Sequence, residues 1–116
     1  MIIYKKNQEV IPHVNCCGGE GTTLVTDLLI KDENLYKNAK LVAYAKLEPG
    51  NSIGYHVHDG EMEAYILIKG QGIYNDNGKE VEVDVGDVTV TFSGEGHAIK
   101  PRGDETLEFI AVICEI

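Results

Sequence analysis

The sequence is poor in positive charge. It contains ten lysine and arginine residues against nineteen aspartate and glutamate residues, a formal net charge of −9, and the basic residues are scattered along the chain. Nucleic acids and anionic membrane surfaces are bound through clustered positive charge. The composition therefore argues against both as partners, and solubility is the simplest explanation of the acidity.

Long apolar segments and paired cysteines are also missing. No apolar run approaches the roughly 18 residues that a membrane span needs, and Met1–Lys6 lacks the apolar stretch of a secretory signal. The three cysteines do not make a disulfide framework, which is typical of a reducing compartment, so we expect a cytoplasmic protein. Cys114 fits a small core residue. Cys16 and Cys17 could be soft metal ligands, although neither has a partner at the usual zinc spacing.

With 116 residues the chain has room for one domain, and we expect residues 1–116 to form it. A chain of this length buries roughly two thirds of its unfolded surface, which is enough for a core without disulfides. The hydrophobic fraction of 43% and the charged fraction of 25% are those of an ordinary globular protein. Nucleotide and flavin motifs are absent, and the lack of a Gly-x-Ser-x-Gly element disfavours a serine hydrolase.

Eight segments have the composition or the alternation of β-strands, and no segment has a sustained helical period. The predicted strands are 22–30, 39–48, 55–58, 64–68, 72–75, 80–85, 88–92 and 107–116. Glycine-rich turns separate them, and Asn77-Gly78 suits a tight hairpin. Short strands joined by such turns predict an all-β sandwich or barrel.

Two of the predicted strands are apolar on both faces. Tyr65 and Leu67 share one face of their strand while Ile66 and Ile68 share the other, and the strand 107–116 has the same pattern. A small barrel exposes its outer face to water unless something covers it. A second subunit is the simplest cover, so we predict a homodimer. The alternative is an N-terminal arm of the same chain folded over that face.

The most informative segment carries two histidines, His56 and His58, which point the same way if the chain is extended. Across a glycine-containing turn, the carboxylate of Glu63 can fold back beside them. Glu61 shares the face of Glu63 and is the alternative carboxylate. His97 follows a later glycine-rich turn and can enter a barrel mouth beside the same strand. Imidazoles with one carboxylate suit a divalent transition metal rather than calcium or magnesium, which prefer oxygen ligands.

These spacings resemble the two sequence motifs of the cupin superfamily, and we interpret the chain as a small single-domain cupin with its motif region at 50–97. The first motif matches at every spacing. The second is altered, with Phe92 where the family usually has proline and Pro101 where it often has asparagine. We expect both departures to change the rim of the pocket, since proline offers no donor. The matching residues are Gly50, His56, His58, Glu63 and Gly70, then Gly86, Asp87, Gly94 and His97.

The resemblance implies a jelly-roll barrel, or double-stranded β-helix, in which His56, His58, Glu63 and His97 hold one divalent transition metal. Manganese, iron, cobalt, nickel, copper and zinc all fit this ligand set. An octahedral ion would keep two positions free for a small-molecule ligand, water or dioxygen. Two other interpretations stay open: a closed tetrahedral zinc with a structural role, and a metal-free barrel whose histidines hydrogen-bond one another and water.

Tyr65 is the candidate catalytic residue, because it shares a strand face with Glu63 and its phenol could donate a proton. Packing is the alternative role for this side chain. We predict a metal-dependent enzyme acting on a small oxygenated substrate, of the dioxygenase or isomerase type. Lyase and decarboxylase chemistry are also open, since one fold hosts many reactions. The alternative is a non-catalytic module that binds a small ligand, with a structural or vestigial metal site.

Overall fold

The computed structural model describes residues 1–116 and consists almost entirely of β-strands. No helix in it is long and apolar enough to cross a membrane. The strands are β1 Val10–Val14, β2 Thr22–Leu29, β3 Ala39–Leu47, β4 Ile53–Val57, β5 Glu61–Lys69, β6 Gly72–Asp76, β7 Lys79–Val83, β8 Val88–Thr91, β9 Gly96–Pro101 and β10 Leu107–Glu115, with 3₁₀ turns η1 at Lys5–Asn7 and η2 at Cys16–Gly18.

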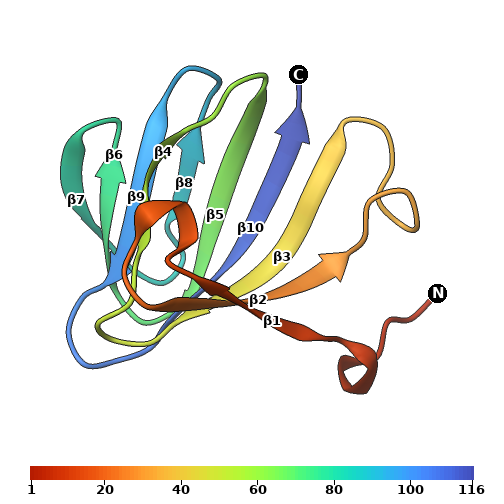
Figure 1. Ribbon diagram of the computed structural model, residues 1–116, viewed down its shortest axis with the longest axis horizontal. Coiled ribbons are helices and arrows are strands. Elements are labelled where there is room, and N and C mark those ends of the chain that lie inside the picture. The colour runs from red at the N-terminus through yellow and green to blue at the C-terminus, as the bar shows by residue number, and fades with distance from the viewer.

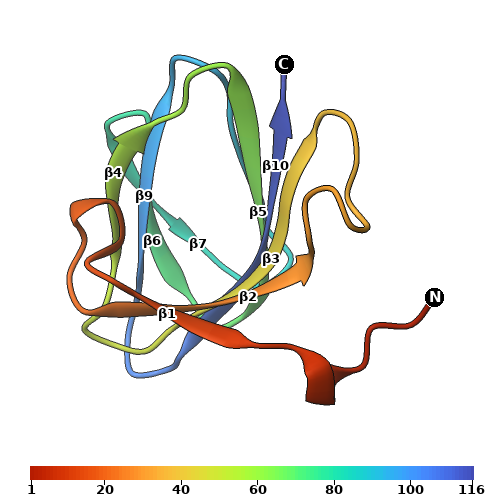
Figure 2. The same ribbon diagram turned by 45° about the vertical axis from the view of Figure 1, so that its right-hand side comes forward.

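Two antiparallel sheets face one another and enclose a barrel (Figures 1 and 2). One sheet has the strand order β1-β2-β3-β10-β5-β8 and the other has the order β4-β9-β6-β7. From β3 to β10 the chain crosses repeatedly between the sheets and stays in one sheet only for the β6–β7 hairpin. This winding is that of a jelly roll, and the all-β prediction is confirmed.

All eight predicted strands are present, with ends displaced by a few residues, but two further strands were not predicted. In β1, every residue is exposed and Pro12 interrupts the pattern, which is tolerated because β1 lies at the edge of its sheet. In β9, a period-2 signal exists, since His97 and Ile99 are buried while Lys100 is exposed. The signal is short, and the glycines before it and Pro101 at its end hide it.

The predicted hairpin at Asn77-Gly78 is confirmed. Strands β6 and β7 pair with Asp76 opposite Lys79, so the connection contains only these two residues. Their φ angles are 53° and 100°, both in the left-handed region. Asparagine tolerates this conformation and glycine adopts it freely, which is why the pair favours a turn that matches the twist of the flanking strands.

The core lies between the sheets and is built from inward-facing side chains. Leu47 on β3 lies opposite Leu107 on β10, and both are 0% exposed. Burying a leucine in this way stabilises the fold by roughly 1.5–3 kcal/mol. The buried cluster contains Ala45, Leu47, Ile53, Tyr65, Leu67, Tyr74, Ile99, Leu107, Phe109 and Ala111. The histidines lie beside this cluster, inside the same barrel.

The outer face of the six-stranded sheet is apolar and uncovered. Ile66 on β5 pairs with Val88 on β8 and with Ile110 on β10, and the exposed fractions of Ile66 and Val88 are 38% and 58%. The N-terminal arm does not cover this face, because Met1 and Ile2 are exposed and the N-terminus leads away from the barrel (Figure 2). The alternative of an arm folded over the sheet is therefore wrong.

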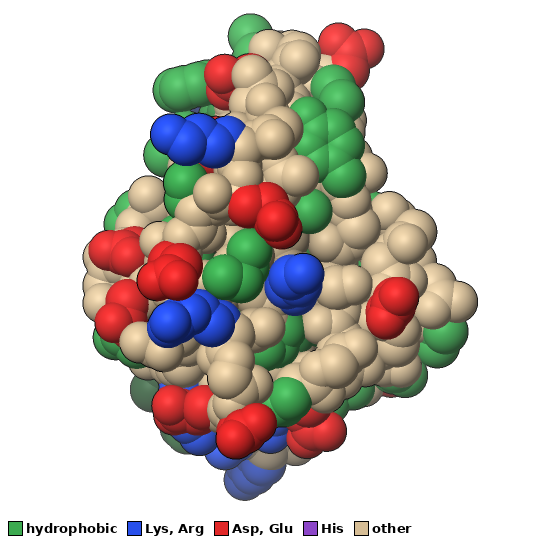
Figure 3. Space-filling model, turned by 90° about the vertical axis from the view of Figure 1, so that its left-hand side faces the viewer, with side chains coloured by type: hydrophobic (Ala, Val, Ile, Leu, Met, Phe, Trp, Pro, Cys, Tyr) green, Lys and Arg blue, Asp and Glu red, His purple; other side chains and the backbone are tan.

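The outer face of the four-stranded sheet is polar instead. Glu80, Glu82 and Lys100 are exposed on it, and the Arg102 Nε lies 3.3 Å from a carboxylate oxygen of Glu82. Figure 3 views this side of the molecule, where acidic and basic side chains are interspersed. This face is suited to water, and nothing about it requires a cover.

Candidate metal centre

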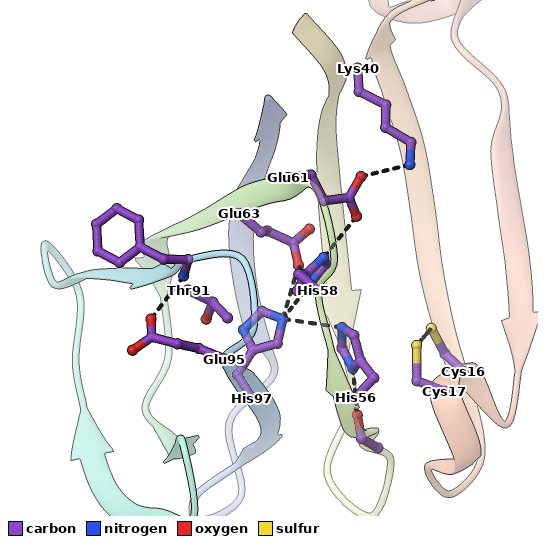
Figure 4. Close-up of polar contacts among 12 residues, drawn as sticks. Cys16, Cys17, Lys40, His56, His58, Glu61, Glu63, Thr91, Glu95 and His97 are labelled. Atoms are coloured by element: carbon purple, nitrogen blue, oxygen red, sulfur yellow. Dashed lines mark hydrogen bonds and ion pairs between the residues drawn. The ribbon is translucent and has the colours of Figure 1, made fainter. Parts of the chain in front are cut away.

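Three strands bring the predicted site residues together. Strand β4 carries His56 and leads directly into His58, β5 carries Glu63, and β9 carries His97. His56 and His97 are direct partners in the β4–β9 pairing, which confirms that His97 lies beside the first pair of histidines. The four side chains point toward one another from both sheets (Figure 4).

The donor atoms of these four residues converge. Nε2 of His97 lies 3.0 Å from Nε2 of His58, 3.1 Å from Nε2 of His56 and 3.0 Å from a carboxylate oxygen of Glu63. One ligand atom from each residue lies within 4.8 Å of the others. His58, Glu63 and His97 are buried, and His56 is half-buried. Burial lowers the pKa of His56, which favours the neutral imidazole that binds metals.

Each histidine uses its other nitrogen, Nδ1, to contact a fixed partner. For His56 the partner is the carbonyl oxygen of Gly54 at 2.7 Å, and for His58 it is a carboxylate oxygen of Glu61 at 2.8 Å. For His97 it is the hydroxyl of Tyr74 at 2.8 Å, which continues to a threonine hydroxyl on β8. When Nδ1 carries the proton, the lone pair of Nε2 points into the cluster.

This arrangement fits a metal ion. If the three imidazoles are neutral and carry their proton on Nδ1, none has a proton on Nε2, and the close Nε2 contacts are then not hydrogen bonds. Lone pairs and a carboxylate directed at one point repel each other, and a cation among them removes the repulsion. The four residues therefore form a cluster that could hold a divalent transition metal.

Glu61 lies outside this cluster and has a different role from Glu63. One of its oxygens accepts the hydrogen bond from His58, and the other lies 2.7 Å from Nζ of Lys40. The hydrogen bond from Lys40 lowers the pKa of Glu61, so the carboxylate stays ionised. Glu61 thus orients His58. The sequence places Glu61 near the site, but it does not distinguish a ligand from a residue that positions a ligand.

Two residues that support the histidines were missed by the sequence interpretation: Tyr74 on β6 contacts His97 directly, and Lys40 on β3 contacts Glu61. Tyr74 is buried between the half-buried Ile73 and Asn75, and this alternation along β6 could have found it. Lys40 is separated from Glu61 by 21 positions in the chain and carries no local signal. Only the folded sheet shows that the two side chains meet.

Tyr65 packs directly against the cluster. Its ring stacks on that of His97, with centroids 4.9 Å apart and planes at 24°, and it contacts Phe109 on the other side. Tyr65 is 3% exposed, and burial raises the pKa of its phenol well above the usual value. The hydroxyl therefore stays protonated near neutral pH. It can donate a hydrogen bond, whereas the raised pKa makes the phenol a weaker acid than free tyrosine.

An open cavity of about 370 Å³ borders the cluster. His56, His58, Glu63 and Tyr65 line it, and most of the remaining wall is apolar and comes from β2, β3 and β10. A larger hollow of about 630 Å³ lies outside the barrel over β4, β6 and β9, and none of the four donors lines it. The smaller cavity is therefore the one that gives a ligand access to the donors.

Cys16 and Cys17 lie on η2 and line the same cavity, beside His56 (Figure 4). Their sulfurs are 3.8 Å apart and are not part of the four-donor cluster. The turn lies tightly against β4, because a Cβ added to Gly54 would lie 2.2 Å from the carbonyl oxygen of Cys17. Glycine at position 54 is what allows the two backbones to approach this closely.

The expected effect of Phe92 and Pro101 on the pocket rim is wrong, because neither residue lines the cavity. Phe92 follows β8 on its outward-facing side and is 60% exposed. Pro101 ends β9 and borders the outer hollow instead. The second motif thus differs from the family pattern at positions that do not touch the cavity.

Known proteins are similar to this chain in both sequence and fold. The family model described as "Cupin domain" matches residues 43–113. The oxalate-binding protein of Thermotoga maritima is 44% identical over 110 residues, which cover 93% of this chain and 90% of the relative. A solved structure from Thermotoga maritima, described as a "predicted oxalate decarboxylase", is 40% identical with a TM-score of 0.94 and 100% of both chains covered.

A second solved structure, a cupin-like protein of Thermotoga maritima, is 30% identical with a TM-score of 0.70, and the match covers 84% of this chain and 71% of that one. The family match spans more than half of the sequence, and it includes all four donors. The geometry and the similarities therefore agree with the resemblance in the motif region, and the chain belongs to the cupin family.

Proposed function

We propose that this protein binds a small chelating carboxylate of the oxalate type through a divalent transition metal held by His56, His58, Glu63 and His97. The observation that carries the proposal is the convergence of four donor atoms within 4.8 Å at the wall of a cavity. A bound ion of this kind supplies Lewis acidity and open coordination positions for ligand oxygens. The name of the oxalate-binding relative, 44% identical, supports the same ligand class.

The residues of the chain have separate tasks in this proposal. The histidines and Glu63 hold the ion, and Glu61, Tyr74 and the carbonyl of Gly54 fix the orientation of the imidazoles. With a divalent ion, the three neutral imidazoles and one carboxylate carry a net charge of +1, which attracts an anion. The apolar wall excludes water and so strengthens the interaction of the ion with a carboxylate.

The test is calorimetric titration of oxalate into protein loaded separately with manganese, iron, cobalt, nickel, copper or zinc. Metal identity is a prediction limited to this group, and the titrations also rank its members. We expect oxalate to bind the loaded protein and not the metal-free protein. Equal oxalate binding with and without metal, or none with any of the six metals, would overturn the proposal.

A second candidate is catalysis on the same ligand, favoured by the position of Tyr65, which lines the cavity and stacks on His97. Cleavage of the carbon–carbon bond of oxalate consumes one proton and gives formate and carbon dioxide, and Tyr65 would be the proton donor. Formate formation followed by proton NMR tests this role, with Tyr65→Phe as the variant. Loss of formation with retained oxalate binding is expected, whereas unchanged formation excludes Tyr65 as the donor.

Dioxygenase and isomerase activities stay predictions, to be tested on the same loaded protein by oxygen uptake and by interconversion of small sugars. A cytoplasmic location also stays a prediction, as does the assignment of residues 1–116 to one domain. We further propose that the uncovered outer face of the six-stranded sheet binds a second copy of this chain, which keeps the expectation of a homodimer.

A further inference from the structure

The wall of the cavity beside the donors is made of unusually small side chains. Ala43 and Ala45 on β3 and Ala111 on β10 all line it. Ala43 lies directly opposite Ala111, and Ala45 lies opposite Phe109. Elsewhere on the same inner face, leucines meet across these two strands and fill the barrel. The alanines therefore leave open a volume that larger residues would occupy, next to the metal cluster.

This alanine-lined wall offers an anionic ligand no lysine or arginine side chain. Val25, Leu41, Phe109 and Ile113 line it too, together with His13, Cys16, Cys17, Thr23 and Asp27. Its polar groups beside the donors are the phenol of Tyr65 and the Thr23 hydroxyl, which is buried without a hydrogen-bond partner, while the exposed Asp27 on β2 lies opposite Ala43. An anionic group that entered the alanine-lined wall would lose its hydration without gaining a cation.

Oxalate chelates a metal through one oxygen of each carboxylate. A 2-oxo acid chelates through one carboxylate oxygen and its keto oxygen, and its alkyl group takes the place of the remaining oxygen of the second carboxylate. The alkyl group would lie against the alanines, Val25 and Phe109, where burial is favourable. We infer that the ligand suited to this cavity is a small 2-oxo monocarboxylic acid with a short alkyl chain. This inference rests on the proposed metal-dependent binding of carboxylates and names the class of carboxylate.

The test uses the manganese-loaded protein and a series with one negative charge and a growing chain: glyoxylate, pyruvate, 2-oxobutanoate and 2-oxopentanoate, with oxalate alongside. Each methylene that is buried should tighten binding about fourfold. Calorimetry gives the four dissociation constants. Affinity that is constant or falls along the series overturns the inference, and if oxalate still binds, the proposed function survives. If neither oxalate nor any 2-oxo acid binds, both fail.

Filling the cavity supplies the matching variants. Ala111→Leu should abolish the increase in affinity with chain length and leave metal content and glyoxylate binding unchanged. Ala98→Leu is the control, because Ala98 lines the outer hollow and not the cavity. If Ala111→Leu loses its β circular dichroism, Ala43→Val makes the same test with a smaller increase in volume. Retention of the full chain-length gain in a folded cavity variant would show that the alkyl chain lies elsewhere, which overturns the inference.

Discussion

The two faces of the six-stranded sheet are both apolar, but they differ in the size and the cover of their side chains. On the inner face, Ala43 and Ala111 are buried at 1% and 6% exposure and leave a cavity between the sheets. On the outer face, Ile66, Val88 and Val90 are large and remain 38–58% exposed. The inner face is buried against the other sheet and borders a cavity, while the outer face carries large side chains that nothing buries.

This difference shows that apolar side chains on a strand can serve different functions on its two faces. Small side chains inside a barrel reduce packing, and a natural reason to accept that cost is room for a ligand. Large apolar side chains outside a barrel increase the surface exposed to water, and a natural reason to accept that cost is a partner. The two faces thus point to two different kinds of binding, and each can be tested separately.

The largest effect is expected at the donors, which lie beside the cavity that the inner face leaves open. His58→Ala removes one donor and should reduce metal content from one ion per chain to near background, while circular dichroism stays that of the folded protein. Elemental analysis of the purified protein measures the loss. His13→Ala is the matched control, because His13 lies outside the four-donor cluster. Full occupancy in His58→Ala would show that the ligand assignment is incorrect.

The outer face is tested by placing a charge on it. Ile66→Asp should convert a dimer into a monomer, because a carboxylate buried at the interface would lose its hydration. Sedimentation velocity at micromolar concentration distinguishes the two states. Ile73→Asp is the control, since Ile73 lies on the four-stranded sheet beside the outer hollow. A wild-type protein that sediments as a monomer would contradict the dimer.

A smaller effect is expected from the residue that orients His58. Glu61→Gln removes the charge that holds the histidine and Lys40, and such changes beside a metal ligand typically weaken metal binding by about 10–100-fold. Competition with a fluorescent chelator gives the affinity. Glu95→Gln is a useful control, because the Glu95 carboxylate accepts a hydrogen bond from the Phe92 backbone N–H, and Glu95 meets His58 only through its backbone carbonyl. Glu63→Gln should weaken metal binding more than Glu61→Gln does. The reverse order would reopen the choice between the two carboxylates as the metal ligand.

The smallest effect is expected on the reactivity of Cys17, whose side chain lines the cavity. Burial, together with neighbouring Cys16, raises the pKa of Cys17 to about 11. Because only the thiolate reacts, alkylation of Cys17 by iodoacetamide should be slow at pH 8 and should rise about tenfold per pH unit up to pH 10. Mass spectrometry of the labelled peptide follows the rate. A rate that levels off near pH 9 would mean that the thiol behaves as in free solution.

The sequence predicts much of the fold because its signals are local. Alternation in 64–68 and 107–116 correctly separates inward from outward residues, and Asn77-Gly78 correctly predicts a hairpin. The strands that were missed have weak local signals. Every residue of β1 is exposed, so no face is marked by burial, and β9 is short and ends in proline. Although β9 was missed as a strand, its residue His97 was predicted to lie beside His56, with which it pairs.

What the sequence by itself determined is the all-β class and the two-faced strands, because alternation depends on residues close together in the chain. The motif spacings also predicted the four candidate donors, which the fold brings together. What only the tertiary structure decided is the different roles of Glu61 and Glu63, the support of His97 by Tyr74, and the alanine-lined cavity. These depend on contacts between strands far apart in sequence, such as Lys40 with Glu61 and Ala43 with Ala111. Cross-strand register, which no local pattern encodes, places each of these pairs together.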